Sequence, residues 1–245
     1  MGEALRQIEL TDQEVAFYQE EGYLLIPRLL RDEEVTPLRA EILGILDIIG
    51  LGKTKLRQTK QYLAGSHLDG LINSATLVGL ASRLMEGPST LHSPFTAVKS
   101  PGGTEFHFHQ DNQYTRFDGP GINFWFALED MSPENGCLLI APRSHRNGTI
   151  EGVESPDKDG HRTVDREPEY YFPIRMRSGD CVAFSRLTVH GSGFNGTNEP
   201  RVAYGVQFFR NDVKALHPDG EWRLLKEFPR IDAGPVEVIA AENVA

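Results

Sequence analysis

Cysteine is scarce in this chain of 245 residues, which contains only Cys137 and Cys181. Each lies in an apolar, strand-like segment, so no disulfide framework is expected, and two buried free thiols in a reducing cytoplasm are predicted. The sequence has no apolar run as long as a membrane span, and its first six residues lack the apolar core of a signal peptide. We therefore expect a cytoplasmic protein without a membrane partner.

Basic residues are also outnumbered, with 25 Lys and Arg against 35 Asp and Glu, which gives a formal net charge of −10. This deficit argues against a nucleic-acid partner, because phosphate binding needs a basic face. The sequence has no internal repeat or low-complexity segment, and no feature that indicates an obligate protein partner. A hydrophobic content of 39% over this length is enough for one well-buried domain. A small-molecule substrate fits these limits best.

The segment that organises the rest runs from Thr104 to Asp111 with the sequence TEFHFHQD. If it is a strand, alternation places Glu105, His107, His109 and Asp111 on one face. His109 and Asp111 would then supply two-thirds of a facial triad, the arrangement typical of non-haem Fe(II). The competing interpretation is a half-buried strand with a polar, solvated face.

A third metal ligand is available further along the chain. The apolar strand predicted at 182–184 continues to His190, which begins the run HGSGFNGTNEPR. In the strand that follows, alternation puts Arg201 on one face with small residues, which leaves room for a ligand beside the guanidinium. A permanently charged planar fork suits a ligand carboxylate, and the Ser192 hydroxyl would be a second donor to the same group.

These motifs together resemble the phytanoyl-CoA dioxygenase family of Fe(II)- and 2-oxoglutarate-dependent oxygenases. The resemblance extends over residues 10–208. It is carried by the His109-x-Asp111 pair, by the distal His190-Gly-Ser-Gly with Asn195 and Arg201, and by three further segments: WFALED at 125–130, PENGCL at 133–138 and APRSH at 141–145. In the last of these, Arg143 stands where the family usually has glycine.

The resemblance implies a fold that is mainly β with flanking helices (α+β). Its core would be a double-stranded β-helix, a cupin-like jelly roll, with N-terminal helices packed on one sheet. It also implies Fe(II) on His109, Asp111 and His190, with O₂ and 2-oxoglutarate as cosubstrates. The residues it implies for binding 2-oxoglutarate are Arg201, Ser192, Trp125, Gln110 and Phe95.

The expected organisation is a single domain over 1–245. Residues 1–90 would form a helical support, 94–210 the jelly-roll core with a lid loop at 149–172, and 211–245 a C-terminal tail. Thr11 and Glu14 predict a capping box for the first helix. A single helix is predicted over 71–84, and the barrel is expected to begin at Pro94.

The expected reaction is hydroxylation of an unactivated C–H bond of a small molecule, coupled to oxidative decarboxylation of 2-oxoglutarate to succinate and CO₂. The carboxylate of Asp111 argues against halogenation, because the related halogenases have a small residue there. Tyr114, Arg116 and Lys99 are candidates for substrate contact. The limited chain length favours a free small molecule over an acyl-CoA thioester.

Three alternatives remain open from the sequence. His107 shares the ligand face, so a cupin-type metalloenzyme that uses His107 is one of them. A non-catalytic jelly roll that senses metal or 2-oxoglutarate is the second. A zinc hydrolase is the third, although a hydrolase would leave Arg201 without a role.

Overall fold

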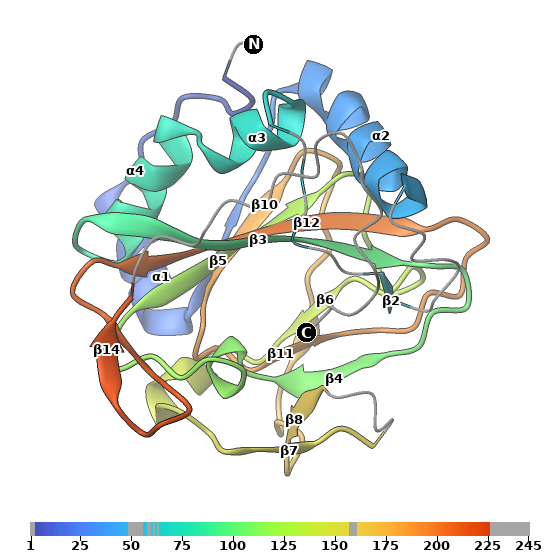
Figure 1. The fold of residues 1–245 in the computed structure, drawn as a ribbon. Coiled ribbons are helices and arrows are strands. Elements are labelled where there is room, and N and C mark those ends of the chain that lie inside the picture. Colours follow the sequence, from blue (N-terminus) through green and yellow to red (C-terminus); the bar gives the residue numbers. More distant parts are fainter. Residues whose placement is uncertain are drawn as a thin grey trace.

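The computed structural model describes residues 3–48, 56–57, 60, 62, 64–156 and 161–225. Two facing antiparallel sheets dominate this part of the chain (Figure 1). The large sheet has the order β1-β10-β5-β12-β3-β2 and the small sheet the order β4-β11-β6-β9. This mainly β jelly roll, with helices on one sheet, confirms the predicted fold class.

The strands of the large sheet are β1 (Tyr23–Ile26), β2 (Leu56–Arg57), β3 (Ser89–Lys99), β5 (Gly121–Ala127), β10 (Cys181–Ser185) and β12 (Arg201–Arg210). Those of the small sheet are β4 (Phe106–His109), β6 (Leu138–Ile140), β9 (Phe172–Pro173) and β11 (His190–Ser192). Two hairpins form separate two-stranded sheets, β7 (Gly152–Glu154) with β8 (Arg162–Val164), and β13 (Lys214–Leu216) with β14 (Trp222–Leu224).

Both faces of the large sheet are buried, but by different residues. Large apolar side chains of β5 and β12, such as Phe124 and Tyr204, pack outward against the helices. Small or polar residues alternate with them and face the small sheet, where Ala127 and Ala203 join the inter-sheet core. The period-two pattern read from the sequence is therefore confirmed in both strands. Its result is that Arg201 shares the inner face of β12 with small residues.

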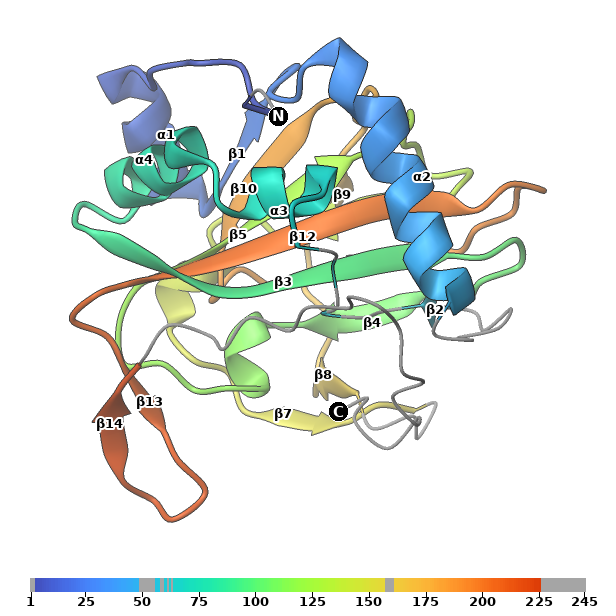
Figure 2. The same ribbon diagram turned by 45° about the horizontal axis from the view of Figure 1, so that its top comes forward.

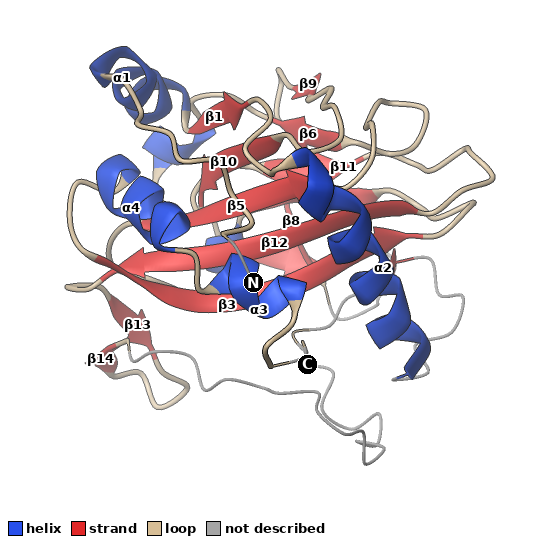
Figure 3. Cartoon of the chain, turned by 90° about the horizontal axis from the view of Figure 1, so that it is seen from above, coloured by secondary structure: helices blue, strands red, loops and turns tan. Residues whose placement is uncertain are grey.

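Four α-helices of the described residues cover the outer face of the large sheet (Figures 2 and 3). They are α1 (Asp12–Glu21), α2 (Asp32–Ile48), α3 (His67–Ile72) and α4 (Ala75–Leu84). The capping box predicted from Thr11 and Glu14 is present at the start of α1. No helix in the described part of the chain is long and apolar enough to cross a membrane.

Three sequence-based boundaries were wrong. The helix predicted over 71–84 is two helices, because Ser74 caps α4 and so ends α3 before it. β3 begins at Ser89 and not at Pro94. A proline is tolerated inside this strand because, among the described residues, β2 pairs with β3 only at Val98 and Lys99, so Pro94 has β12 alone as its neighbour. The segment 149–172 is not one irregular loop, because it contains the β7–β8 hairpin; residues 157–160 lie outside the described residues.

Candidate metal centre and anion pocket

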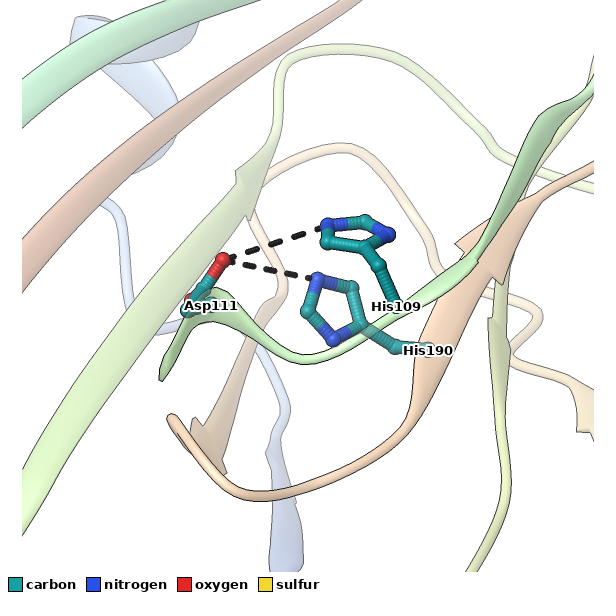
Figure 4. A group of neighbouring side chains, drawn as sticks. All are labelled: His109, Asp111 and His190. Atoms are coloured by element: carbon teal, nitrogen blue, oxygen red, sulfur yellow. Dashed lines mark ion pairs between the residues drawn. The ribbon is translucent and has the colours of Figure 1, made fainter. Parts of the chain in front are cut away.

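His109, Asp111 and His190 converge inside the barrel (Figure 4). Their potential ligand atoms all lie within 4.8 Å of one another, and all three side chains are buried. Asp111 Oδ1 is 4.0 Å from His109 Nε2 and 3.8 Å from His190 Nε2. Three ligand atoms at this separation, contributed by two imidazoles and a carboxylate, fit a single divalent transition metal.

The strands fix which nitrogen of each imidazole faces the centre. Nδ1 of His109 donates to the His107 carbonyl at 2.9 Å, and Nδ1 of His190 donates to the Thr188 carbonyl at 2.9 Å. In a neutral imidazole such a bond makes Nε2 the nitrogen that can bind a metal, and in both residues Nε2 is the nitrogen nearest Asp111. Burial and the neighbouring His190 lower the pKa of His109 to about 3, so its imidazole is in the neutral form that binds metals.

Hydrogen bonds to one of its two oxygens hold the carboxylate of Asp111 in place. Oδ2 accepts hydrogen bonds from Gln207 Nε2 at 3.0 Å and from Asn123 Nδ2 at 3.3 Å. Burial opposes ionisation, but the neighbouring His190 and the positive charge of Arg186 outweigh it, so the pKa of Asp111 stays below its usual value. Oδ1 is therefore left ionised and directed toward the two imidazoles.

Two irregularities interrupt the strand expected over Thr104 to Asp111, although His109 and Asp111 still face the same centre. β4 stops at His109, and Asp111 begins a 3₁₀ turn that ends at Gln113. In addition, His190 pairs with His109 but Ser192 pairs with Phe106, so β4 contains a bulge. The extra residue brings the Phe106 ring to 4.8 Å from the His109 ring, although alternation places them on opposite faces. His107 is not a member of the metal-capable group.

Arg201 is a buried cation whose guanidinium makes no hydrogen bond to the described residues. Its side chain is only 1% exposed, and none of its three guanidinium nitrogens has a hydrogen bond in the described part of the chain. Burial lowers its pKa to about 10, which still leaves it charged at neutral pH. The carboxylate of Glu129 partly offsets this burial through its charge, but it makes no hydrogen bond to the guanidinium. A buried guanidinium whose donors are unsatisfied is costly, so Arg201 is suited to bind an additional anion.

A second buried cation lies next to Arg201. Lys99 faces Arg201 across the β3–β12 pairing, and its Nζ donates to Ser192 Oγ at 2.8 Å and to the Gly193 carbonyl. Burial, followed by the charge of Arg201, lowers the pKa of Lys99 to about 7. Lys99 was expected to contact substrate, and it lies with Arg201 and Ser192 in a buried group that we call the anion pocket.

Two aromatic side chains pack beside Arg201. The Trp125 ring lies 5.4 Å from the Arg201 guanidinium carbon, and its buried Nε1 has no hydrogen-bond partner among the described residues. Phe95 packs against Trp125 with ring centroids 6.1 Å apart. Gly205 makes space for Phe95, since a Cβ there would lie 2.3 Å from the ring. Phe95 and Trp125, both expected to contact 2-oxoglutarate, therefore lie together beside Arg201.

The other predicted site residues are placed differently. Gln110 is fully buried, and its amide bonds to the carbonyls of Gly148 and Leu187 and to the Ile150 N–H, so no donor is left for a ligand. The Tyr114 ring lies 5.7 Å from the His109 ring, beside the metal centre. Arg116 is exposed and pairs with Glu151 at 2.9 Å, on the β7–β8 hairpin side.

Gln207, Asn123 and Arg186 were not predicted as site residues. The alternation pattern did place Gln207 on the Arg201 face and Asn123 on the Trp125 face, so a polar residue on an otherwise small or apolar inner face was the available signal. For Arg186, the residues around it in the sequence gave no such signal.

The model of the phytanoyl-CoA dioxygenase (PhyH) family matches residues 18–203, which is most of the chain. The chain belongs to the phytanoyl-CoA dioxygenase family. Among its relatives are the methylphosphonate hydroxylase of Gimesia maris, with 27% identity over 78% of each chain, and the human peroxisomal phytanoyl-CoA dioxygenase, with 27% identity over 86% of this chain and 72% of that one. The L-proline trans-4-hydroxylase of Streptomyces griseoviridis is 26% identical over 82% of this chain and 87% of its own.

Solved structures agree with this assignment. The non-haem alpha-ketoglutarate-dependent carbocyclase SnoK has a TM-score of 0.66 and 25% identity, covering 84% of this chain and 86% of its own. The epimerase SnoN, solved with Fe³⁺ and alpha-ketoglutarate, has a TM-score of 0.72 at 22% identity, covering 88% and 93%, and supports the fold. This PhyH-family protein is an Fe(II)- and 2-oxoglutarate-dependent oxygenase, so the sensor and hydrolase alternatives are set aside.

The position of Lys99 predicts a pH dependence of 2-oxoglutarate binding. A carboxylate beside Arg201 and Lys99 stabilises the charged form of Lys99, so binding takes up a proton once the pH exceeds the free-protein pKa of about 7. We expect affinity to be highest below pH 7 and to fall by up to about tenfold per pH unit above it.

Calorimetry between pH 6.5 and 8.5, in two buffers of different ionisation enthalpy, measures this proton uptake. Lys99→Met should bind more weakly and lose the pH dependence, whereas substitution of the exposed Lys214 should change neither. An equal slope in wild type and Lys99→Met would contradict the role given to Lys99.

Proposed function

We propose that this PhyH-family enzyme hydroxylates an unactivated C–H bond of a free small molecule, with Fe(II) held by His109, Asp111 and His190. The observation that carries the proposal is the combination of that buried triad with the buried guanidinium of Arg201, whose nitrogens make no hydrogen bond to any described residue. A metal triad alone suits many reactions, but a dicarboxylate such as 2-oxoglutarate accounts for both features at once. Decarboxylation of 2-oxoglutarate to succinate and CO₂ accompanies the hydroxylation.

The residues at the two ends of the pocket have separate tasks. Arg201 binds the distal carboxylate of 2-oxoglutarate, with Lys99 and Ser192 as further donors beside it. Trp125 and Phe95 exclude water between that carboxylate and the triad, which strengthens the charge pairing. When bound, Fe(II) supplies the activation of O₂ that couples cosubstrate decarboxylation to C–H oxidation.

Tyr114 and the residues around it are placed to receive the substrate. The rings of Phe106 and Tyr114 both lie against His109, and His161 packs on Phe106 at 4.6 Å. Two relatives are hydroxylases of small free molecules, methylphosphonate and L-proline, which supports a substrate of that size. Hydroxylation is preferred over halogenation because Asp111 supplies its carboxylate to the triad.

The amino-acid composition supports a reducing compartment and a small-molecule substrate. Two buried free thiols, Cys137 and Cys181, fit a reducing compartment such as the cytoplasm. The net charge of −10 fits a small-molecule substrate better than a nucleic acid.

The direct test is an anaerobic titration of the wild-type protein with Fe(II) and then 2-oxoglutarate. We expect a visible metal-to-ligand charge-transfer band that appears only with both ligands. A screen of free acids, amino acids and phosphonates against acyl-CoA thioesters, read by succinate release and by product mass, then identifies the substrate class. No absorption band with both ligands present would refute the site assignment, and turnover confined to thioesters would refute the free-molecule assignment.

A further inference from the structure

Arg186 is a second buried arginine, and it lies at the opposite end of the interior from Arg201. It follows β10 and is 3% exposed. Its NH1 donates to Gln207 Oε1 at 3.1 Å, and its NH2 donates to the backbone carbonyls of Asp111 at 2.9 Å and Thr115 at 3.0 Å. One guanidinium therefore joins the turn that carries a triad residue to strand β12.

Arg186 also determines which way the Gln207 amide points. A guanidinium has only donors and an ionised carboxylate has only acceptors, whereas a side-chain amide offers one of each. Because Arg186 donates to Oε1, the NH₂ group of Gln207 must face Asp111, where it donates to Oδ2. Without Arg186, the amide could turn and place Oε1 against the carboxylate.

The rest of the fold is shaped to hold Arg186 in this position. Its guanidinium carbon lies 4.1 Å from the centre of the Phe117 ring. Its side chain crosses Gly121, where a Cβ would lie only 2.2 Å from Arg186 Cδ. Burial lowers the pKa of Arg186 to about 10, so it is charged at neutral pH. The Arg186 side chain is thus immobilised, and so are the groups that it binds.

We propose that Arg186 is a positioning residue for the metal centre, acting through Gln207 to fix the Asp111 carboxylate with Oδ1 toward His109 and His190. This inference rests on the proposed role of the triad as the metal site. Arg186 touches neither the metal ligand atoms nor the anion pocket. Its contribution is to hold both the backbone and the side chain of Asp111 before any metal arrives.

The expected effect is on metal affinity. Loss of a hydrogen-bond partner that orients a ligand typically costs 10- to 100-fold in metal affinity. We expect Arg186→Met to weaken Co(II) binding by about that factor and to alter the visible d–d spectrum of the Co(II) protein. Arg186→Lys should recover little, because an ammonium cannot bind three acceptors in the geometry of a planar fork.

Gln207→Met keeps the experiment decisive if Arg186→Met does not fold. Methionine has a volume similar to that of glutamine, and the charge of Arg186 stays in place. The substitution removes the donor to Asp111 Oδ2, so a similar loss of Co(II) affinity is expected. In the double variant the two losses should not multiply, because both residues act through the same carboxylate. Arg210→Met, which removes a half-buried arginine at the end of β12 paired with Asp212, is the matched control.

The outcomes separate this inference from the proposed function. If wild type and His190→Ala bind Co(II) equally well, the triad assignment itself fails. If His190→Ala loses Co(II) but Gln207→Met and the folded Arg186 variants keep wild-type affinity and spectrum, Arg186 is only a structural residue and the inference is overturned. Lower affinity, a changed spectrum and non-multiplying losses would support it.

Discussion

Replacing His190 by alanine is expected to abolish succinate production and to weaken Fe(II) binding by more than about 100-fold, the upper end for residues that merely orient a ligand. The variant keeps only His109 Nε2 and Asp111 Oδ1, which lie 4.0 Å apart. Two ligands cannot fix a divalent metal in the geometry that three provide. The loss should therefore appear in binding as well as in turnover.

The measurement is an anaerobic Fe(II) titration followed by a succinate assay with and without substrate. His217→Ala, in the turn of the β13–β14 hairpin, removes an imidazole from outside the barrel and should behave as wild type. Wild-type Fe(II) affinity in His190→Ala would show that the metal lies elsewhere.

Replacing Arg201 by methionine is expected to affect ligand binding and stability in opposite directions. Removing one partner of a buried charge pair costs about 3–5 kcal/mol, so the dissociation constant of 2-oxoglutarate should rise between about 100-fold and several thousand-fold. Without 2-oxoglutarate, however, the buried guanidinium of Arg201 makes no hydrogen bond within the described part of the fold. Exchanging it for an apolar residue should raise the free energy of unfolding of the cosubstrate-free protein by about 1–4 kcal/mol.

Denaturant unfolding and calorimetric titration measure the two effects. Arg223→Met, which removes an exposed arginine paired with Asp219 on β14, should leave both quantities within error of wild type. A variant that binds 2-oxoglutarate normally would refute the anchor role of Arg201. One that is less stable than wild type would show that the guanidinium has a partner within the fold.

Much of the site could be predicted because its residues lie on strands with a clear pattern. In β12, Arg201 and Ala203 alternate with large apolar residues that pack on the helices, so the inward face is evident from the sequence. The distal His190 and its Gly-Ser-Gly run were equally visible. Local sequence was sufficient wherever alternation was unbroken.

The remaining features depend on contacts between distant segments. The bulge in β4 exists only in its pairing with β11, and no residue type within 106–109 marks it. The role of Gln207 requires Arg186 on one side and Asp111, 96 residues away, on the other. The break between α3 and α4 was locally readable at Ser74, but the apolar periodicity across it outweighed the cap in the prediction.

The bulge also limits how this barrel can change in length. Two residue steps of β11, from His190 to Ser192, span three of β4, from His109 to Phe106. An insertion in the exposed Pro101–Gly102 turn would lengthen a loop and leave this register intact. The same insertion after Phe106 would rotate one imidazole out of the centre, since a one-residue slip reverses side-chain direction. We therefore expect the fold to tolerate insertions in the loops at the rim, but not a single inserted residue within β4.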